Sequence, residues 1–121
     1  MAVRAELLRS HPVLPEWLRV EAVENADEAG RLSGIVDLGE AEAIELAKEL
    51  RADWLLMDER KGRRLAMREG LAVIGLLGVL LLAKRTQLIP SAAKLLVRLE
   101  VEAGIYLSAD IKILALRTVG E

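Results

Sequence analysis

Residues 39–64, GEAEAIELAKELRADWLLMDERKGRR, decide the fold that this sequence predicts. The first half has helical spacing, with an apolar stripe made of Ile44, Leu46, Ala47 and Leu50. The next run, Trp54–Met57, is short, apolar and bounded by charged residues. Such a run is typical of a strand buried on both faces of a parallel sheet. Asp58 and Glu59 follow where this strand ends, and a basic helix start comes next.

Carboxylates stand at both ends of this helix–strand pair. Glu40 and Glu42 fall in the first turns of the helix, and Asp58 follows the strand. Ligands bind at the carboxyl ends of strands in open α/β sheets, and hard divalent cations prefer carboxylate oxygens. These acids are therefore candidate metal ligands. Glu40 and Glu42 point about 200° apart on a helix, so they cannot both face one ion, and spacing leaves the choice between them open.

The same acids also have a purely structural explanation. A carboxylate at a helix N-terminus stabilises the helix by about 0.3–1 kcal/mol without any metal. Asp58 also suits the N-cap of the helix that begins near Arg60. The sequence alone therefore leaves both interpretations of these acids open, metal ligation and helix stabilisation.

The remaining sequence alternates helices with short strands. The pattern predicts one domain over residues 1–121, of the α/β class with a parallel sheet. Besides the central helix and the strand after it, we expect helices at Ala2–Ser10, 26–32, 60–69, 76–86, 91–103 and 109–119, and strands at Arg19–Val23 and 71–74. Asn25, Asp37 and Ser108 are the expected N-caps of the helix at 26–32, the central helix and the helix at 109–119, and Gly75 is the expected start of the helix at 76–86. Pro90 is expected in the first turn of the helix at 91–103, and Gly70 and Gly104 are the expected ends of the helices at 60–69 and 91–103. In the last helix, Ile111, Leu114 and Leu116 are core candidates.

Composition excludes several classes of site. The chain has no cysteine and one histidine, His11, which excludes disulfides, thiol catalysis, zinc–thiolate sites and a histidine triad. The net charge of −2 means that any contact with nucleic acid must come from a local patch. The longest apolar run, Leu71–Ala83, has 13 residues, whereas a membrane span needs about 20. We therefore expect no membrane segment, and the composition agrees with a cytoplasmic protein.

Basic residues follow the acidic strand end. Arg60, Lys61, Arg63 and Arg64 are candidates for binding the phosphates of a nucleic acid. The alternative is an ordinary solvated helix face. Arg60 and Arg64 form a like-charge i,i+4 pair, which an inert helix surface tends to avoid, so the pattern favours a function.

This ordered series of segments, continued by LAVIGLLGVLLLAKRTQLIPSAAKLLVRL, resembles the PIN-domain ribonucleases, in particular a VapC-like branch described as predicted nucleic-acid-binding proteins. The resemblance implies a PIN-like three-layer α/β fold, with a short, mostly parallel sheet flanked by helices. It implies a metal-dependent endoribonuclease that uses Mg²⁺ or Mn²⁺ and acts on single-stranded or structured RNA. Such an enzyme is often the toxin of a toxin–antitoxin pair, with an antitoxin protein as its partner. Residue by residue, Glu6, Glu40 or Glu42, and Asp58 match acidic positions of the family.

One segment of the family pattern has no counterpart in this sequence. PIN domains open with a strand that ends in an aspartate, whereas AVRAELL near the start of this chain resembles a later segment of the family. We therefore expect an N-terminally truncated PIN-like domain. An unpaired strand edge invites another chain, so we also expect a homodimer or higher homo-oligomer. The alternative function is a catalytically incomplete PIN-like interaction module that oligomerises or binds a protein partner.

Overall fold

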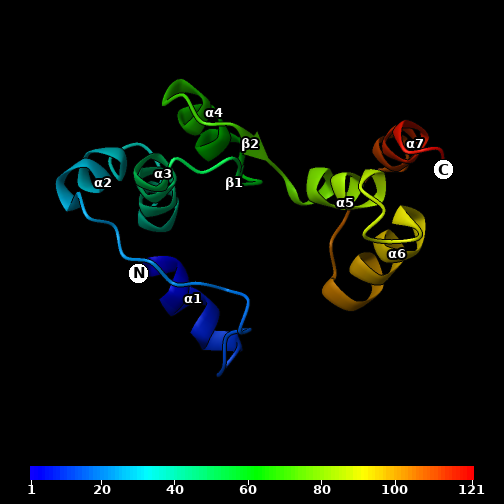
Figure 1. Ribbon diagram of the computed structural model, residues 1–121, viewed down its shortest axis with the longest axis horizontal. Helices are drawn as coiled ribbons and strands as arrows, with labels where there is room; N and C mark the ends of the chain where they lie inside the picture. Colours follow the sequence, from blue (N-terminus) through cyan, green and yellow to red (C-terminus); the bar gives the residue numbers. More distant parts are fainter. The chain divides into compact units, whose positions relative to one another are not determined.

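The computed structural model describes residues 1–121 and contains seven α-helices and a two-stranded sheet. The chain divides into two compact units, Met1–Ile74 and Gly75–Glu121 (Figure 1). Both strands belong to the first unit and run parallel, which confirms the predicted α/β class. The elements are α1 (Ala2–Ser10), α2 (Ala26–Leu32), α3 (Leu38–Leu50), β1 (Leu55–Leu56), α4 (Arg60–Arg68), β2 (Val73–Ile74), α5 (Leu76–Arg85), α6 (Ala92–Ala103) and α7 (Ala109–Thr118).

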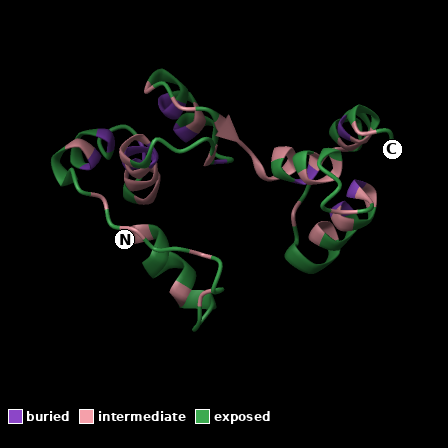
Figure 2. Cartoon of the chain, viewed as in Figure 1, coloured by how far each residue is buried: buried purple, intermediate pink, exposed green.

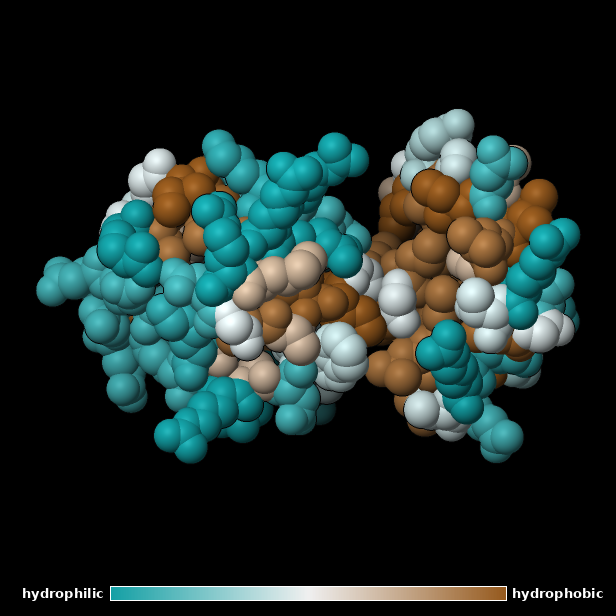
Figure 3. Space-filling view, turned by 90° about the horizontal axis from the view of Figure 1, so that it is seen from above, coloured by the Kyte–Doolittle hydropathy of each residue, from teal (hydrophilic) through white to brown (hydrophobic).

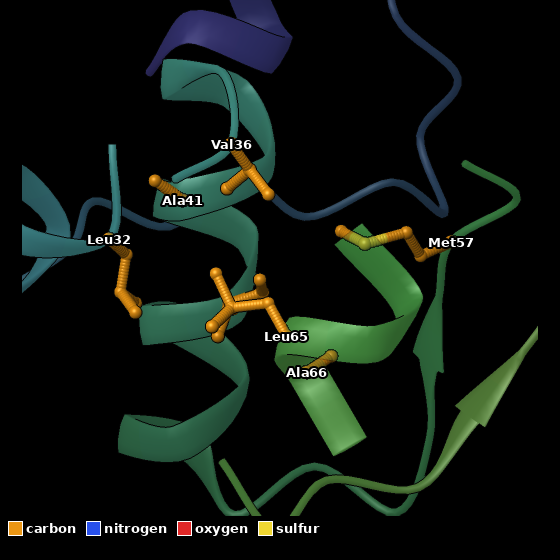
Figure 4. Close-up of a cluster of buried hydrophobic side chains, with 7 residues drawn as sticks. Leu32, Val36, Ala41, Met57, Leu65 and Ala66 are labelled. Atoms are coloured by element: carbon orange, nitrogen blue, oxygen red, sulfur yellow. The ribbon is translucent and has the colours of Figure 1, made fainter. Parts of the chain in front are cut away.

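Helix α3 is the centre of the first unit. Its N-cap is Asp37, as predicted, and the Asp37 carboxylate accepts a hydrogen bond from the Glu40 N–H at 2.9 Å. The buried cluster around α3 consists of Leu32, Val36, Ala41, Ile44, Met57, Leu65 and Ala66. Figure 4 shows these side chains gathered between α2, α3 and α4. Leu50 belongs to the predicted stripe but is exposed, because it lies in the last turn of α3.

The sheet is short. Leu55 pairs with Val73 and Leu56 with Ile74, and the Leu55 N–H donates to the Ala72 carbonyl at 2.8 Å. The prediction that this strand is buried on both faces is wrong, because the Leu56 side chain is 56% exposed. Apolar character alone does not decide which faces of a strand the rest of the chain covers.

One other sequence expectation is wrong in the first unit. Arg19–Val23 forms no strand, since no neighbouring segment supplies a ladder of backbone hydrogen bonds. Within it, the Arg19 guanidinium donates to the Glu21 carboxylate at 2.7 Å, so the charged residues pair locally. Helix α1 is present as predicted, but it buries none of its side chains (Figure 2).

An ion-pair network joins α2, α3 and α4. Arg31 of α2 contacts Glu28 at 2.5 Å and Glu69, the C-cap of α4, at 2.7 Å. Lys48 of α3 contacts Glu28 at 3.3 Å and the buried carboxylate of Glu45 at 3.5 Å. The hydrogen bond from Arg31 is the main reason that the pKa of Glu28 is lowered to about 2. Burial raises the pKa of Glu45.

The second unit is a three-helix assembly of α5, α6 and α7. Its buried cluster is Leu80, Ala92 and Leu96, and Leu116 packs against it as predicted. Ile111 and Leu114 are exposed, so that part of the core prediction is wrong; Ala115 is buried in their place. The predicted caps Ser108 and Gly104 are confirmed, Gly104 with a left-handed φ of 67° that suits glycine.

The start of α6 differs from the prediction. Pro90 precedes α6 and does not lie in its first turn; the N-cap is Ser91, whose hydroxyl accepts from the Lys94 N–H. None of the helices, in either unit, has the length and apolar character that crossing a bilayer requires.

Candidate metal and nucleic-acid site

Acidic side chains surround a hollow of about 290 Å³ in the first unit. The acids come from three separate places: α1, the start of α3, and the loop between β1 and α4. They are Glu6, Asp37, Glu40, Asp58 and Glu59. Val3, Ala43, Leu56 and Met57 supply apolar parts of the wall. The hollow is therefore an acidic pocket whose wall is partly apolar.

Local helix chemistry explains why two of these acids stand there. Asp37 caps α3, and the Glu59 carboxylate caps α4 by accepting the Gly62 N–H at 2.8 Å. Both caps line the hollow, so the N-terminal ends of α3 and α4 border the same space. The N-cap of α4 is Glu59 and not Asp58, so the purely structural explanation offered for Asp58 is wrong.

The electrostatics of the hollow differ from one acid to the next. Burial, and then the charges of Asp37 and Glu59, raise the pKa of Glu40. The backbone N–H groups of Gly62 and Lys61 lower the pKa of Glu59. A cation in this space would offset the repulsion that Glu40 experiences.

Glu40 and Glu42 occupy different environments. Glu40 lines the acidic hollow, whereas Glu42 lines a second, largely apolar hollow of about 200 Å³ beside α1. The Glu42 carboxylate accepts hydrogen bonds from the Met1 amine at 2.5 Å and from the Ala2 N–H at 3.0 Å, and these bonds lower its pKa. Of the acids predicted from the sequence, Glu6, Glu40 and Asp58 share one hollow and Glu42 lies outside it. The helical divergence of residues two apart accounts for this separation.

The donor chemistry of the hollow fits a hard divalent cation, because all its charged walls are carboxylates. The side chains are not drawn together into one coordination sphere. Nowhere in the chain do three or more His, Cys, Asp or Glu side chains form a group that could hold a metal ion.

Basic residues border the hollow through the first turns of α4. Arg60, Lys61 and Arg64 are exposed. The charge of Lys61 helps to lower the pKa of Glu59 and offsets a small part of the rise in the pKa of Glu40. Arg63 is half-buried and its Nη1 donates to the Met57 carbonyl at 3.4 Å. The predicted basic patch therefore adjoins the acidic hollow.

Sequence reasoning did not assign Asp37 and Glu59 to the site. Asp37 was expected only as a helix cap, and Glu59 only as the neighbour of Asp58. The available signal was the position of both acids at helix starts, since a cap side chain lies at the open end of its helix.

A family model described as a PIN domain matches residues 3–121. Comparisons with curated proteins and with solved structures found no match. A PIN domain indicates, in general terms, a nuclease-type function, contact with nucleic acid and the use of divalent metals. The match covers nearly the whole sequence, so this chain belongs to the PIN-domain family.

Proposed function

We propose that this protein is a metal-dependent endoribonuclease that cleaves single-stranded or structured RNA. Glu6, Glu40 and Asp58 would hold Mg²⁺ or Mn²⁺. The observation that carries the proposal is the acidic hollow, because these three carboxylates all line it and the basic start of α4 borders it.

A divalent ion, when bound, lowers the pKa of a coordinated water and offsets charge that develops on the phosphate. The chain's own side chains have separate tasks. Glu6, Glu40 and Asp58 would supply ligand oxygens, while Asp37 and Glu59 add negative potential from their cap positions. Arg60, Lys61 and Arg64 would bind the RNA backbone on either side of the reacting phosphate, because they are exposed cations on the bordering helix. Arg63 would help to hold that helix against the strand end through the Met57 carbonyl.

The test is Mn²⁺-dependent cleavage of a single-stranded RNA, with four proteins compared: wild type, Asp58→Asn, Glu40→Gln and Glu42→Gln. We expect the cleavage rates of Asp58→Asn and Glu40→Gln to fall by about 100-fold or more, as is common when a metal site is damaged. Glu42→Gln is the matched control, since it changes the same residue type on the same helix but outside the hollow. It should stay within about threefold of wild type, a loss that corresponds to less than 1 kcal/mol.

Two results would contradict this function. One is a folded wild-type protein that cleaves no RNA with either Mg²⁺ or Mn²⁺. The other is an equal loss in Glu40→Gln and Glu42→Gln, which would mean that the hollow has no special role.

The second candidate function is an interaction module without catalysis. One observation favours it: no three potential ligands stand close enough to form a metal site. Exposed aromatic residues offer contact area for a partner, since the Trp17 side chain is 80% exposed and that of Tyr106 is 88% exposed. The cleavage assay separates the two candidates.

The enzyme would act in the cytoplasm, as the toxin of a toxin–antitoxin pair, with an antitoxin protein as its partner. We further propose that the chain forms a homodimer or larger homo-oligomer. The two-stranded sheet supports this, because β1 pairs only with β2 and an unpaired strand edge favours pairing with another chain. The Leu56 side chain of β1 is also exposed. Light scattering on size-exclusion fractions tests the oligomer, and a stable monomer at micromolar concentration contradicts it.

A further inference from the structure

Gly62 is a glycine inside a helix, and its backbone conformation does not require one. The residues of this chain with positive φ are others, among them Gly70 and Gly104. Glycine in a helix interior costs about 0.5–1 kcal/mol relative to alanine. The reason for Gly62 must therefore lie in the space around it.

That space is filled by two side chains of the acidic hollow. A Cβ built on Gly62 would overlap the Sδ of Met57. It would also lie 3.3 Å from the Cδ of Glu40 and 3.4 Å from its Oε1. The Glu40 carboxylate thus borders the space beside Gly62 that a side chain would fill. By contrast, a Cβ on Gly30, the glycine inside α2, would meet nothing within 4 Å.

Gly62 also connects the two helix starts. Its N–H donates to Glu59, the cap of α4, while Glu40 of α3 lies next to the position of its missing Cβ. Met57 is buried and cannot move far without disturbing the cluster around α3. A methyl group at position 62 would therefore displace either the Met57 thioether or the Glu40 carboxylate.

We propose that Gly62 is a positioning residue for Glu40: its missing side chain lets the Glu40 carboxylate lie against the first turn of α4, inside the acidic hollow. This inference rests on the proposed function, in which Glu40 is a metal ligand. The role of Gly62 is indirect, since it acts only through the place that it leaves for Glu40.

The contact itself is tested on the metal-free wild-type protein. A nuclear Overhauser cross-peak between the Gly62 α-protons and the Glu40 γ-protons is expected, because the Glu40 carboxylate lies next to the position of the missing Cβ of Gly62. Its absence from an assigned spectrum would overturn the inference without reference to any metal.

The positioning role is tested by Mn²⁺ affinity, measured by titration calorimetry for wild type, Gly62→Ala, Glu40→Gln and the double variant. We expect Gly62→Ala to weaken binding about tenfold, within the usual range for residues that support a ligand. The double variant should bind no more weakly than Glu40→Gln alone, because both changes act through one carboxylate. Gly30→Ala is the matched control and should stay within about twofold.

The outcomes separate this inference from the proposed function. If wild type binds no Mn²⁺, or if Glu40→Gln has no effect, the function fails and the inference fails with it. If Glu40→Gln weakens binding but Gly62→Ala has no effect, only the inference is overturned. The same holds if the losses in affinity of Gly62→Ala and Glu40→Gln multiply in the double variant. If Gly62→Ala does not fold, the double variant Met57→Val/Gly62→Ala is used in its place, because Met57→Val removes the sulfur that the new methyl group would overlap. Its Mn²⁺ affinity is then compared with that of Met57→Val in place of wild type.

Discussion

The two compact units bury different kinds of side chain. The first unit, Met1–Ile74, buries the carboxylate of Glu45 among its apolar core and joins three helices by ion pairs. The second unit, Gly75–Glu121, buries only apolar residues. Both units leave large apolar side chains exposed, for example Leu38 in the first and Leu114 in the second. On the face that Figure 3 draws, hydrophilic colour is more extensive over the first unit and hydrophobic colour over the second.

The difference indicates a division of roles. Charged groups that are held in place by packing and by caps can act on a charged ligand, and in this chain they gather around α3 and the start of α4. Exposed aliphatic side chains cannot do such chemistry, and large apolar patches instead mark surfaces for association. We therefore assign the proposed chemistry to the first unit. The predictions below test the contrast, from the largest expected effect to the smallest.

The core of the first unit should respond most strongly to truncation. The Ile44 side chain is fully buried, whereas that of Leu114 in the second unit is 67% exposed. Ile44→Ala should lower the free energy of unfolding by about 2–5 kcal/mol, since it removes transfer energy and leaves a cavity. Leu114→Ala, the control, should change it by less than about 0.5 kcal/mol. Urea denaturation measures both, and similar losses would refute the contrast in burial.

The ion pairs of the two units should also differ. Lys48→Met leaves the buried Glu45 carboxylate without its cation and should cost about 1–3 kcal/mol. Arg98→Met breaks an exposed i,i+4 pair with Glu102 in the second unit and should cost less than about 0.5 kcal/mol. Urea denaturation in low and high salt measures both losses. An equal cost for the two variants would mean that burial does not strengthen the network.

The pH dependence should have opposite signs in the two units. Burial raises the pKa of Glu45, so its native-state charge is unfavourable. Glu45→Gln should therefore stabilise the protein at neutral pH, by up to about 1–2 kcal/mol. Hydrogen bonds from the Ala92 N–H and the Ser91 hydroxyl lower the pKa of Glu121, so its charge is favourable and Glu121→Gln should destabilise.

Both differences from wild type should shrink as the pH falls. For Glu45, the gain is lost as wild-type Glu45 becomes protonated, at a pH above its ordinary pKa of 4.5. For Glu121, the loss disappears below 4.5, as the wild-type carboxylate takes up its proton. Thermal denaturation between pH 3 and pH 7 gives the two profiles. Profiles of the same sign would contradict the assigned causes.

The smallest effect concerns two helix caps. Asp37→Ser keeps a capping oxygen at α3 and removes one charge from the hollow, and Ser108→Asp makes the reverse exchange at α7. Both should change the free energy of unfolding by less than about 0.5 kcal/mol, because both residue types cap well. Only Asp37→Ser should weaken Mn²⁺ binding, by a few-fold. A loss of Mn²⁺ affinity in Ser108→Asp as well would show that the hollow is not the binding site.

Local sequence chemistry predicted most element boundaries. Asn25, Asp37 and Ser108 were recognised as caps because a side-chain oxygen before a helical pattern satisfies free N–H groups within a few residues. The parallel sheet followed from two short apolar runs separated by a helix. The errors at Leu56 and Leu114 concern burial, which depends on residues far away in the sequence.

The sequence by itself therefore determined the helices, their caps, the α/β class and the set of acids from which a site could be built. These properties depend on neighbours within a turn or two of the chain. Only the tertiary structure decided that Glu40 and not Glu42 shares a hollow with Glu6 and Asp58, and that Asp37 and Glu59 complete its wall. The physical reason is that three separate segments meet there, and their meeting depends on how α1, α3 and α4 pack together.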